Sequence, residues 1–269
     1  MPDINDELRL GVGTGRLRDR RDCFETVKSA IEQGYRHIDT ARHYRNERAI
    51  GDALDEVDVE RDKLFVSTKI HSRNLSRQDL RDSVEKSRQR LGLEQIDLVY
   101  VHWPAHSYEP SETLPALEEL RDEGVVRHIG LSNFTPTQIT EAESILDAPI
   151  FAIQAEMHPF LQQQELCEFA ATNDYWLVAH SPLCGGDVTD NTALEKIAER
   201  HGCSAAQVSL AWVLSHDGTA AVPGAKSQYL EHNRRALSVE LTDRDRETIA
   251  AIGMERRMVD YSFAPWRSE

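Results

Sequence analysis

Short runs of apolar residues alternate with longer, more polar segments along this chain. The apolar runs lack a regular alternation of apolar and polar positions, which is typical of parallel strands buried on both faces. Eight runs are therefore predicted to be strands, at residues 9–13, 36–39, 64–69, 97–102, 127–132, 151–154, 176–180 and 220–224.

The segments between these runs carry helix signals. Their apolar residues recur three or four positions apart, a spacing that places them on one face of a helix. Residues able to cap a first turn precede several segments, and glycine follows two of them. The predicted starts are Asp22 with Glu25 as a capping-box-like pair, Ser76, Thr135-Pro136, Ser204 and Thr242, and the predicted ends are Gly34 and Gly92.

Eight strands separated by helices predict a (β/α)8 barrel, the TIM barrel, with one parallel sheet and one domain over residues 1–269. A doubly wound sheet is the alternative. The stretch GVGTG at residues 11–15 holds only two glycine spacings of a dinucleotide-binding loop, and a charged segment follows it. The pattern therefore favours the barrel.

The composition fits one large core and a cytoplasmic location. Of the 269 residues, 40% are hydrophobic, yet no apolar run approaches the roughly 20 residues of a membrane span. The first residues have neither the basic nor the apolar region of a secretory signal. Four cysteines show no metal-binding spacing, so we expect reduced thiols and no metal site: Cys23, Cys167, Cys184 and Cys203.

The net charge of −15 argues against nucleic acid or an anionic membrane as a partner. Acidic residues number 46 against 31 basic ones, and only six of the basic residues are lysine. Two explanations stay open. One is an ordinary solvated surface, and the other is adaptation to high salt, in which dense carboxylates keep the protein hydrated.

Polar side chains stand at or just past the ends of the predicted strands. In a parallel barrel these ends meet on one face, where barrels carry their active sites. Side chains distant in sequence are therefore expected to converge there: Asp39, Lys69, His102, Asn133, Gln154 and His180.

Five motifs, in this order, resemble those of the aldo-keto reductases: GYRHIDTA, VSTK, VHWP, IGLSNF and VPGAKS. The resemblance covers about residues 9–267 and is closest to prokaryotic members with short loops, such as 2,5-diketo-gluconic acid reductases. It implies an oxidoreductase that uses NADP(H), with NAD(H) as the alternative, on a small carbonyl or alcohol substrate. It also implies a monomer.

By this resemblance, Asp39, Tyr44, Lys69 and His102 match the catalytic centre of the family. A reduced carbonyl oxygen needs a proton, which a tyrosine can donate although its ordinary pKa is about 10. A lysine ammonium favours the phenolate and lowers that pKa, and a carboxylate holds the lysine in place. His102 would orient the substrate oxygen through a hydrogen bond.

The resemblance also implies three groups of cofactor-binding residues, at the nicotinamide, under the pyrophosphate and at the adenosine phosphate. Hydroxyl and amide side chains satisfy a carboxamide, while a cation and a hydroxyl at the last group favour NADP(H). His180 belongs to the first group and stands where a ring usually stacks on the nicotinamide. The three groups are Ser132, Asn133, Gln154 and His180; Ser181 and Leu183; and Lys226, Ser227 and Asn233.

The substrate side departs from the pattern of the family. Trp103 is retained as a wall, but His71 and Gly15 stand where tryptophans are usual. Each missing ring removes about 150–250 Å² of apolar surface, so the pocket is expected to be wide. The aromatic residues between positions 261 and 266 either fold back onto this wall or fray with the tail.

Two other functions stay open. One is a cofactor-binding regulatory protein on the same fold, and the intact tyrosine, lysine, aspartate and histidine count against it. The other is a different barrel enzyme, such as an isomerase, and the VHWP and GLSNF segments count against that.

Overall fold

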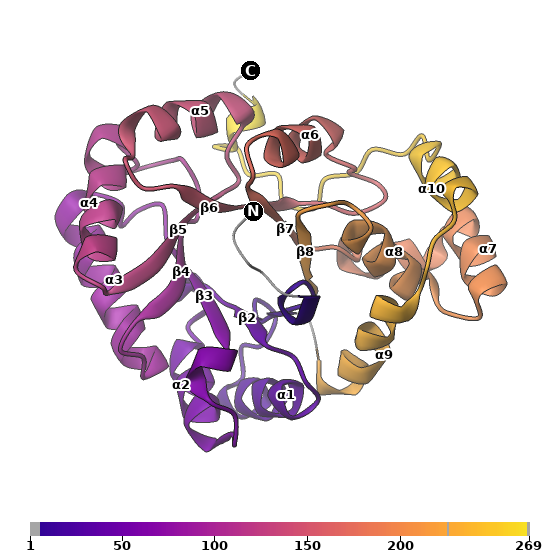
Figure 1. The fold of residues 1–269 in the computed structure, drawn as a ribbon, viewed down its shortest axis with the longest axis horizontal. Helices are drawn as coiled ribbons and strands as arrows, with labels where there is room; N and C mark the ends of the chain where they lie inside the picture. The colour runs from indigo at the N-terminus through magenta and orange to yellow at the C-terminus, as the bar shows by residue number, and fades with distance from the viewer. Residues whose placement is uncertain (1–5, 225, 268–269) are drawn as a thin grey trace.

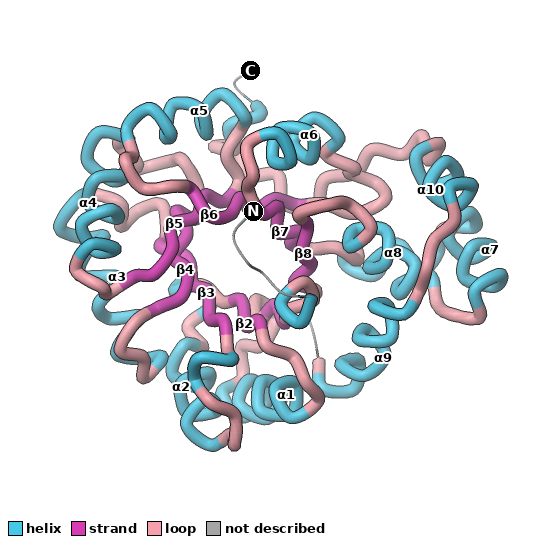
Figure 2. The backbone as a smooth tube through the Cα atoms, viewed as in Figure 1, coloured by secondary structure: helices cyan, strands magenta, loops and turns pink. Residues whose placement is uncertain are grey.

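The computed structural model describes residues 6–224 and 226–267, and its strands form a ring at the centre of the molecule (Figure 2). All eight are parallel, and each pairs with its neighbour in chain order. The strands are β1 (Val12–Gly13), β2 (His37–Asp39), β3 (Phe65–Ile70), β4 (Ile96–Val101), β5 (Val126–Ser132), β6 (Ile150–Glu156), β7 (Trp176–His180) and β8 (Thr219–Val222).

The ring closes where the first strand meets the last. Gly13 forms a bridge with Gly224 and donates its N–H to Pro223 O at 2.9 Å. A Cβ at Gly13 would lie 2.6 Å from Val222 O, a distance that side-chain carbons do not adopt. A glycine at this position therefore lets the two strands approach closely enough to pair.

Helices cover the outside of the ring (Figure 1). In the described residues, each of β1 to β6 is followed by one α-helix, and two α-helices follow each of β7 and β8. In the described part of the chain they are α1 (Arg20–Glu32), α2 (Glu47–Glu56), α3 (Arg77–Leu91), α4 (Pro110–Asp122), α5 (Pro136–Ile145), α6 (Gln164–Thr172), α7 (Thr192–His201), α8 (Ala205–Leu214), α9 (Leu230–Arg234) and α10 (Asp243–Ala250).

Most of the predicted helix boundaries are confirmed. Thr135, Ser204 and Thr242 each form a capping box with the third residue of the helix that follows. The predicted capping box at Asp22 is wrong, because α1 begins earlier and the Asp19 side chain accepts hydrogen bonds from the N–H groups of the first turn. Both aspartates precede the apolar face, so spacing alone does not select between them.

Aromatic rings fill the end of the barrel at which the strands begin. Phe65, His128 and Phe151 lie near the starts of β3, β5 and β6, and the rings of His128 and Phe151 stack 4.0 Å apart. Phe65 stacks on Phe151 at 5.8 Å. Stacked rings therefore occupy the barrel interior at this end. Space for a ligand is left at the opposite end, where the strands finish.

The structure confirms the (β/α)8 barrel, and all eight predicted strands exist with ends shifted by at most three residues. Five helices lie outside the predicted set: α2, α4, α6, α7 and α9. Among the described residues, no helix combines the length and apolar character needed to cross a membrane.

Candidate active site

A cavity of about 1020 Å³ opens at the ends of the strands. Asp39, Tyr44 and His102 line it, and Lys69 lies directly behind Asp39 with only 1% of its surface exposed. The barrel thus brings together four side chains that stand on or after three different strands, as the sequence predicted. This cavity is the candidate active site.

Lys69 and Asp39 form a buried ion pair inside the barrel. Lys69 Nζ donates to Asp39 Oδ1 and, at 2.9 Å, to Thr40 O. The second carboxylate oxygen, Oδ2, accepts hydrogen bonds of 2.9 Å from Ser67 Oγ and from Gln154 Nε2. Each charge therefore has its counter-charge and further polar partners, which offsets the desolvation that burial imposes.

Tyr44 lies beside this pair, at the end of a short 3-10 helix (Arg42–Tyr44) that follows β2. Lys69 Nζ is 5.6 Å from the centre of the Tyr44 ring. Burial raises the pKa of Tyr44, and the Lys69 ammonium opposes that rise. A Cβ at Gly15 would lie 3.2 Å from Tyr44 Cζ, so the missing side chain at residue 15 leaves room for this ring.

His102 follows β4 and presents its ring edge-on to Tyr44, with 6.3 Å between ring centres. Burial and the nearby Lys69 ammonium hold the pKa of His102 well below its ordinary value, so the imidazole is neutral at neutral pH. Its Nδ1 is buried without a hydrogen-bond partner among the described residues. Nε2 is then the ring nitrogen that can exchange a hydrogen bond with a ligand.

The residues predicted to hold a carboxamide also lie together. Asn133 adopts a left-handed conformation with φ of 63°, and its Nδ2 donates to His102 O and to Ser132 Oγ, both at 3.0 Å. Asn133 Oδ1 lies 3.2 Å from His180 Nε2. Gln154 joins them through the bond from Asn133 N to its carbonyl oxygen. Hydroxyl and amide groups therefore share one level of the cavity.

His180 is fixed as a neutral ring. Burial lowers its pKa to about 4, although the nearby Glu156 carboxylate acts in the opposite direction. Its Nδ1 lies 3.2 Å from Ser181 Oγ, and its Nε2 meets Asn133. At neutral pH this ring can therefore offer an uncharged surface to a ligand in the cavity.

The predicted phosphate end is only partly assembled around the cavity. Ser181, Leu183 and Asn233 line it, the last from α9. Lys226 and Ser227 are exposed at the start of the segment after β8 and lie outside the residues that line the cavity. The structure does not bring these two side chains to the same wall as the others.

Sequence reasoning missed Arg16, which lines the cavity from the loop after β1. Its guanidinium lies 3.6 Å from the position that a Cβ on Gly185 would take, and its Cδ lies 3.7 Å from that of Gly224. Arg16 therefore places a cation between the loops after β7 and β8. No motif marks it, because it is one of several arginines in a charged stretch.

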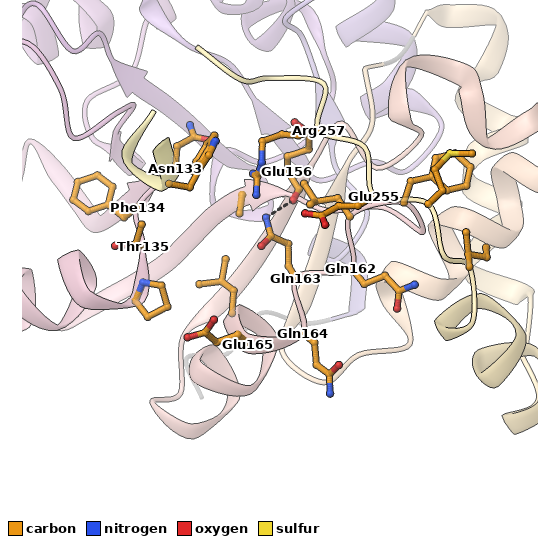
Figure 3. Close-up of a pocket in the computed structure, with 18 of the residues that line it drawn as sticks. Asn133, Phe134, Thr135, Glu156, Gln162, Gln163, Gln164, Glu165, Glu255 and Arg257 are labelled. Carbon is orange, nitrogen blue, oxygen red and sulfur yellow. Dashed lines mark hydrogen bonds between the residues drawn. The ribbon is translucent and has the colours of Figure 1, made fainter. Parts of the chain in front are cut away.

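A second missed feature is Glu156, a buried carboxylate that holds the C-terminal tail. Its oxygens accept hydrogen bonds from Met258 N at 2.6 Å, Val259 N at 2.8 Å and His158 Nε2 at 2.9 Å. Figure 3 shows Glu156 in a neighbouring pocket of about 480 Å³, with Gln163 donating to its carbonyl oxygen. The sequence did offer one signal for Glu156. It is a polar residue at the end of a strand, β6, as several of the predicted site residues are.

The C-terminal tail, which Glu156 holds, folds back onto Trp103. Of the two predicted alternatives, folding back and fraying, the structure shows the first. The rings of Tyr261, Phe263 and Trp266 each lie 5.5 Å from the ring of Trp103. Tyr261 and Phe263 also line the cavity. Glu156 thus holds the tail segment that places these two rings in the wall of the cavity.

The fold and the cavity define a barrel protein with a buried lysine–carboxylate pair next to a tyrosine and a neutral histidine. The family model described as the aldo/keto reductase family matches residues 9–253. The chain belongs to the aldo/keto reductase family, whose members are oxidoreductases that act on small carbonyl compounds and use nicotinamide cofactors, generally NADPH.

Among its relatives is the methylglyoxal reductase DkgB of Escherichia coli O157:H7, 36% identical over 254 residues, which are 93% of this chain and 94% of that protein. The glyoxal reductase of Bacillus subtilis (strain 168) is 36% identical over 253 residues, covering 93% and 90% of the two chains. A crystal structure provisionally assigned as a 2,5-diketo-D-gluconic acid reductase B superposes with a TM-score of 0.91 at 31% identity and covers 95% of this chain and 92% of its own.

Proposed function

We propose that the protein reduces aldehydes and ketones to alcohols with NADPH, and that Tyr44 donates the proton. The observation that carries this proposal is the buried Lys69–Asp39 pair beside Tyr44 in the cavity. An ion pair in a barrel interior is costly, and a purely structural core would be as stable with apolar residues. Its position next to a tyrosine supports a chemical role.

The donor set in the cavity fits a nicotinamide dinucleotide, which when bound supplies the hydride. Ser132, Asn133 and Gln154 present the hydroxyl and amide groups that a carboxamide needs, beside the uncharged ring of His180. The wall then continues, towards the phosphate end, through residues that suit a pyrophosphate and its attached nucleotide: Arg16, Ser181, Leu183 and Asn233. Lys226 and Ser227, exposed after β8, are assigned to the 2′-phosphate.

Four side chains have different roles in protonating the substrate oxygen. His102 orients the oxygen through Nε2, because its Nδ1 is buried and its ring is neutral. Tyr44 gives its proton to the oxygen as negative charge develops there. Lys69 stabilises the phenolate that remains, and Asp39 holds Lys69 in position through the buried pair.

Small reactive aldehydes and 1,2-dicarbonyl compounds are the proposed substrates. Two relatives that align over nine-tenths of the chain bear the names methylglyoxal reductase and glyoxal reductase. The cavity supports this choice, because its 1020 Å³ would have to admit both a dinucleotide and a substrate and so leaves space for a small one.

A single-domain cytoplasmic monomer is part of the same proposal. All four cysteines are free, and burial raises the pKa of the Cys23 thiol to about 12 and that of Cys167 to about 11, so both are unreactive thiols. Unreactive, unpaired thiols are compatible with a reducing compartment.

The test is to follow NADPH and NADH consumption with methylglyoxal, glyoxal, benzaldehyde and a simple ketone. The proposal expects turnover of at least one aldehyde and a higher kcat/KM with NADPH. Binding of NADPH without turnover of any carbonyl would favour the regulatory protein instead. Absence of cofactor binding would contradict the proposal as a whole.

A further inference from the structure

Tyr100 is a buried tyrosine beside Lys69, and the proposed reaction assigns it no role. It lies inside the barrel on β4, fully buried, and the parallel pairing of β3 with β4 places it directly opposite Lys69. It is not one of the residues that line the cavity, so a ligand in that cavity does not touch it. An effect of Tyr100 on the reaction would therefore have to act through a neighbouring side chain.

Two tyrosine rings lie close to the Lys69 ammonium. Nζ is 5.6 Å from the centre of the Tyr44 ring and 5.8 Å from the centre of the Tyr100 ring, and both distances are within the range of a cation–π contact. Tyr44 comes from the segment after β2 and Tyr100 from β4, and these strands are the two neighbours of β3. The oxygens to which Nζ donates, on Asp39 and Thr40, belong to the end of β2 and the residue after it. On the β4 side, the ammonium therefore meets the ring of Tyr100.

A glycine on the next strand makes room for this ring. Gly130 on β5 pairs with Tyr100, and a Cβ at Gly130 would lie 2.5 Å from Tyr100 Cδ1 and 2.6 Å from Tyr100 Cε1. Side-chain carbons do not approach so closely, so the ring fills the space that a side chain at residue 130 would need. Tyr100 therefore fits between the side chain of Lys69 on one neighbouring strand and the bare backbone of Gly130 on the other.

The hydroxyl of Tyr100 stays protonated and unpaired. Burial raises the pKa of Tyr100 well above its ordinary value, the Asp39 carboxylate raises it further, and the Gln154 side chain opposes the rise. Among the described residues, the hydroxyl oxygen is buried without a hydrogen-bond partner. A buried, unpaired hydroxyl destabilises the fold, and an aliphatic side chain such as that of Leu98, also inside the barrel on β4, would avoid this loss. Packing alone therefore does not explain a tyrosine at this position.

We propose that Tyr100 is a positioning residue for the proton transfer, because its ring holds the Lys69 ammonium from the β4 side and so keeps the positive charge next to Tyr44. Cation–π attraction is strongest where the cation is desolvated, as it is here. A shorter aliphatic side chain at residue 100 would leave space on the β4 side, and the flexible lysine stem lets the ammonium withdraw into it. This inference rests on the proposed reduction of carbonyl compounds and adds a residue to that reaction.

The groups that face Tyr44 set the direction of the expected change. Burial has the largest effect and raises the pKa of Tyr44, Lys69 on β3 lowers it, and Asp39 on β2 and Tyr261 of the tail raise it. His102, which follows β4 and meets Tyr44 edge-on, is neutral. If the ammonium withdraws, the influence that lowers the pKa weakens and the others remain. The pKa of Tyr44 should then rise.

The test is the variant Tyr100→Leu, with kcat/KM measured against pH under NADPH for the aldehyde that the wild-type protein turns over best. The falling limb follows the pKa of the proton donor, so it should move about 0.5–1 pH unit upwards. At neutral pH, kcat/KM should fall about 3–10-fold, mainly in kcat, because the phenolate is less stable. Tyr100→Met, a second variant without the ring, should shift the limb in the same direction. Tyr100→Phe keeps the ring and loses only the unpaired hydroxyl, so it should keep the wild-type profile.

Phe151→Leu is the matched control, because it also removes a buried ring from the barrel interior, at the end where the strands begin. It should lower Tm, as Tyr100→Leu does, and leave the pH profile unshifted. A second comparison repeats Tyr100→Leu in the variant Lys69→Met, in which there is no ammonium to hold. There the substitution should again lower Tm, but it should change kcat/KM by less than about twofold and leave the profile where it is.

The outcomes are distinguishable. A shift in Tyr100→Leu that is missing from Tyr100→Phe and Phe151→Leu, and that disappears in Lys69→Met, supports the positioning role. An unshifted profile, or an equal loss of kcat/KM with and without Lys69, overturns that role and leaves the reductase standing. Failure of both ring-free variants to fold, while Phe151→Leu folds, assigns Tyr100 to stability and also overturns it. Absence of turnover of any aldehyde by the wild-type protein overturns the reductase and, with it, the positioning role.

Discussion

Replacing Lys69 with methionine separates the structural role of the buried ion pair from its chemical role. Only 1% of Lys69 and 3% of Asp39 are exposed, so the carboxylate left behind has neither a counter-charge nor solvent. Breaking a buried pair in this way costs about 3–5 kcal/mol. At about 2–4 °C per kcal/mol for a chain of this size, Tm should fall by about 6–20 °C.

A second replacement, Asp39→Asn, tests whether the stability lost in Lys69→Met comes from the unpaired carboxylate of Asp39. An asparagine oxygen can still accept the hydrogen bonds that Ser67 and Gln154 donate to Asp39 Oδ2. The double variant Lys69→Met/Asp39→Asn contains no unpaired buried charge and should recover most of the lost stability. Lys28→Met, which removes one partner of an exposed pair with Glu56, should leave Tm almost unchanged and is the control.

Activity should not return with stability. Tyrosine donates a proton only in its protonated form, so the rate falls as the pH rises through the pKa of Tyr44. Burial raises that pKa and Lys69 opposes the rise. Without Lys69 the falling limb should move to higher pH, and kcat/KM at neutral pH should fall about 10–100-fold because the phenolate is less stable. Thermal melts and pH profiles of both variants check this, and a double variant with wild-type turnover and an unshifted profile would refute the chemical role.

Three further predictions concern the cofactor, the tail and the surface. Lys226→Ala should weaken NADPH binding about 10–150-fold and NADH binding much less, as measured by fluorescence titration, and equal losses would remove Lys226 from phosphate recognition. Glu156→Gln should raise KM for benzaldehyde about 10-fold with little change in kcat for glyoxal, because one N–H of the tail loses its acceptor. Glu165→Gln, which changes a carboxylate in the same pocket, is the control and should change neither constant. If the acidic surface reflects high-salt adaptation, Tm should keep rising in KCl beyond about 1 M, where simple screening is already complete.

The positions of side chains on strands were predictable, because a parallel barrel brings the C-terminal ends of all its strands to one face. Asp39, Lys69, Gln154 and His180 each follow from two observations, a short apolar run and a polar residue at its end. Parallel pairing in chain order then brings them to one mouth, whatever their separation in sequence.

Side chains on loops were less predictable, because no periodicity fixes where a loop points. Arg16 lines the cavity from a loop whose sequence shows only a run of charged residues, and Lys226 lies outside the cavity wall although its motif matched. The fold of the tail was equally open, since its position depends on Glu156, a residue about 100 positions earlier in the chain.

The boundaries of the helices show the same limit on a smaller scale. Thr135 was identified as a cap because a proline follows it, and Ser204 because it stands directly before the helical segment. Before α1, Asp19 and Asp22 both qualify, and the choice depends on which first turn lets Cys23 and Val27 reach the core. Tertiary packing decides between signals of equal local strength.

The central claim is that Tyr44 gives the proton, and Tyr44→Phe tests it most directly. The substitution keeps the ring and removes the hydroxyl. We expect kcat/KM for methylglyoxal to fall about 10²–10⁴-fold while the Kd for NADPH, measured by fluorescence titration, stays unchanged. Turnover within about threefold of the parent, with the same Kd, would contradict the account.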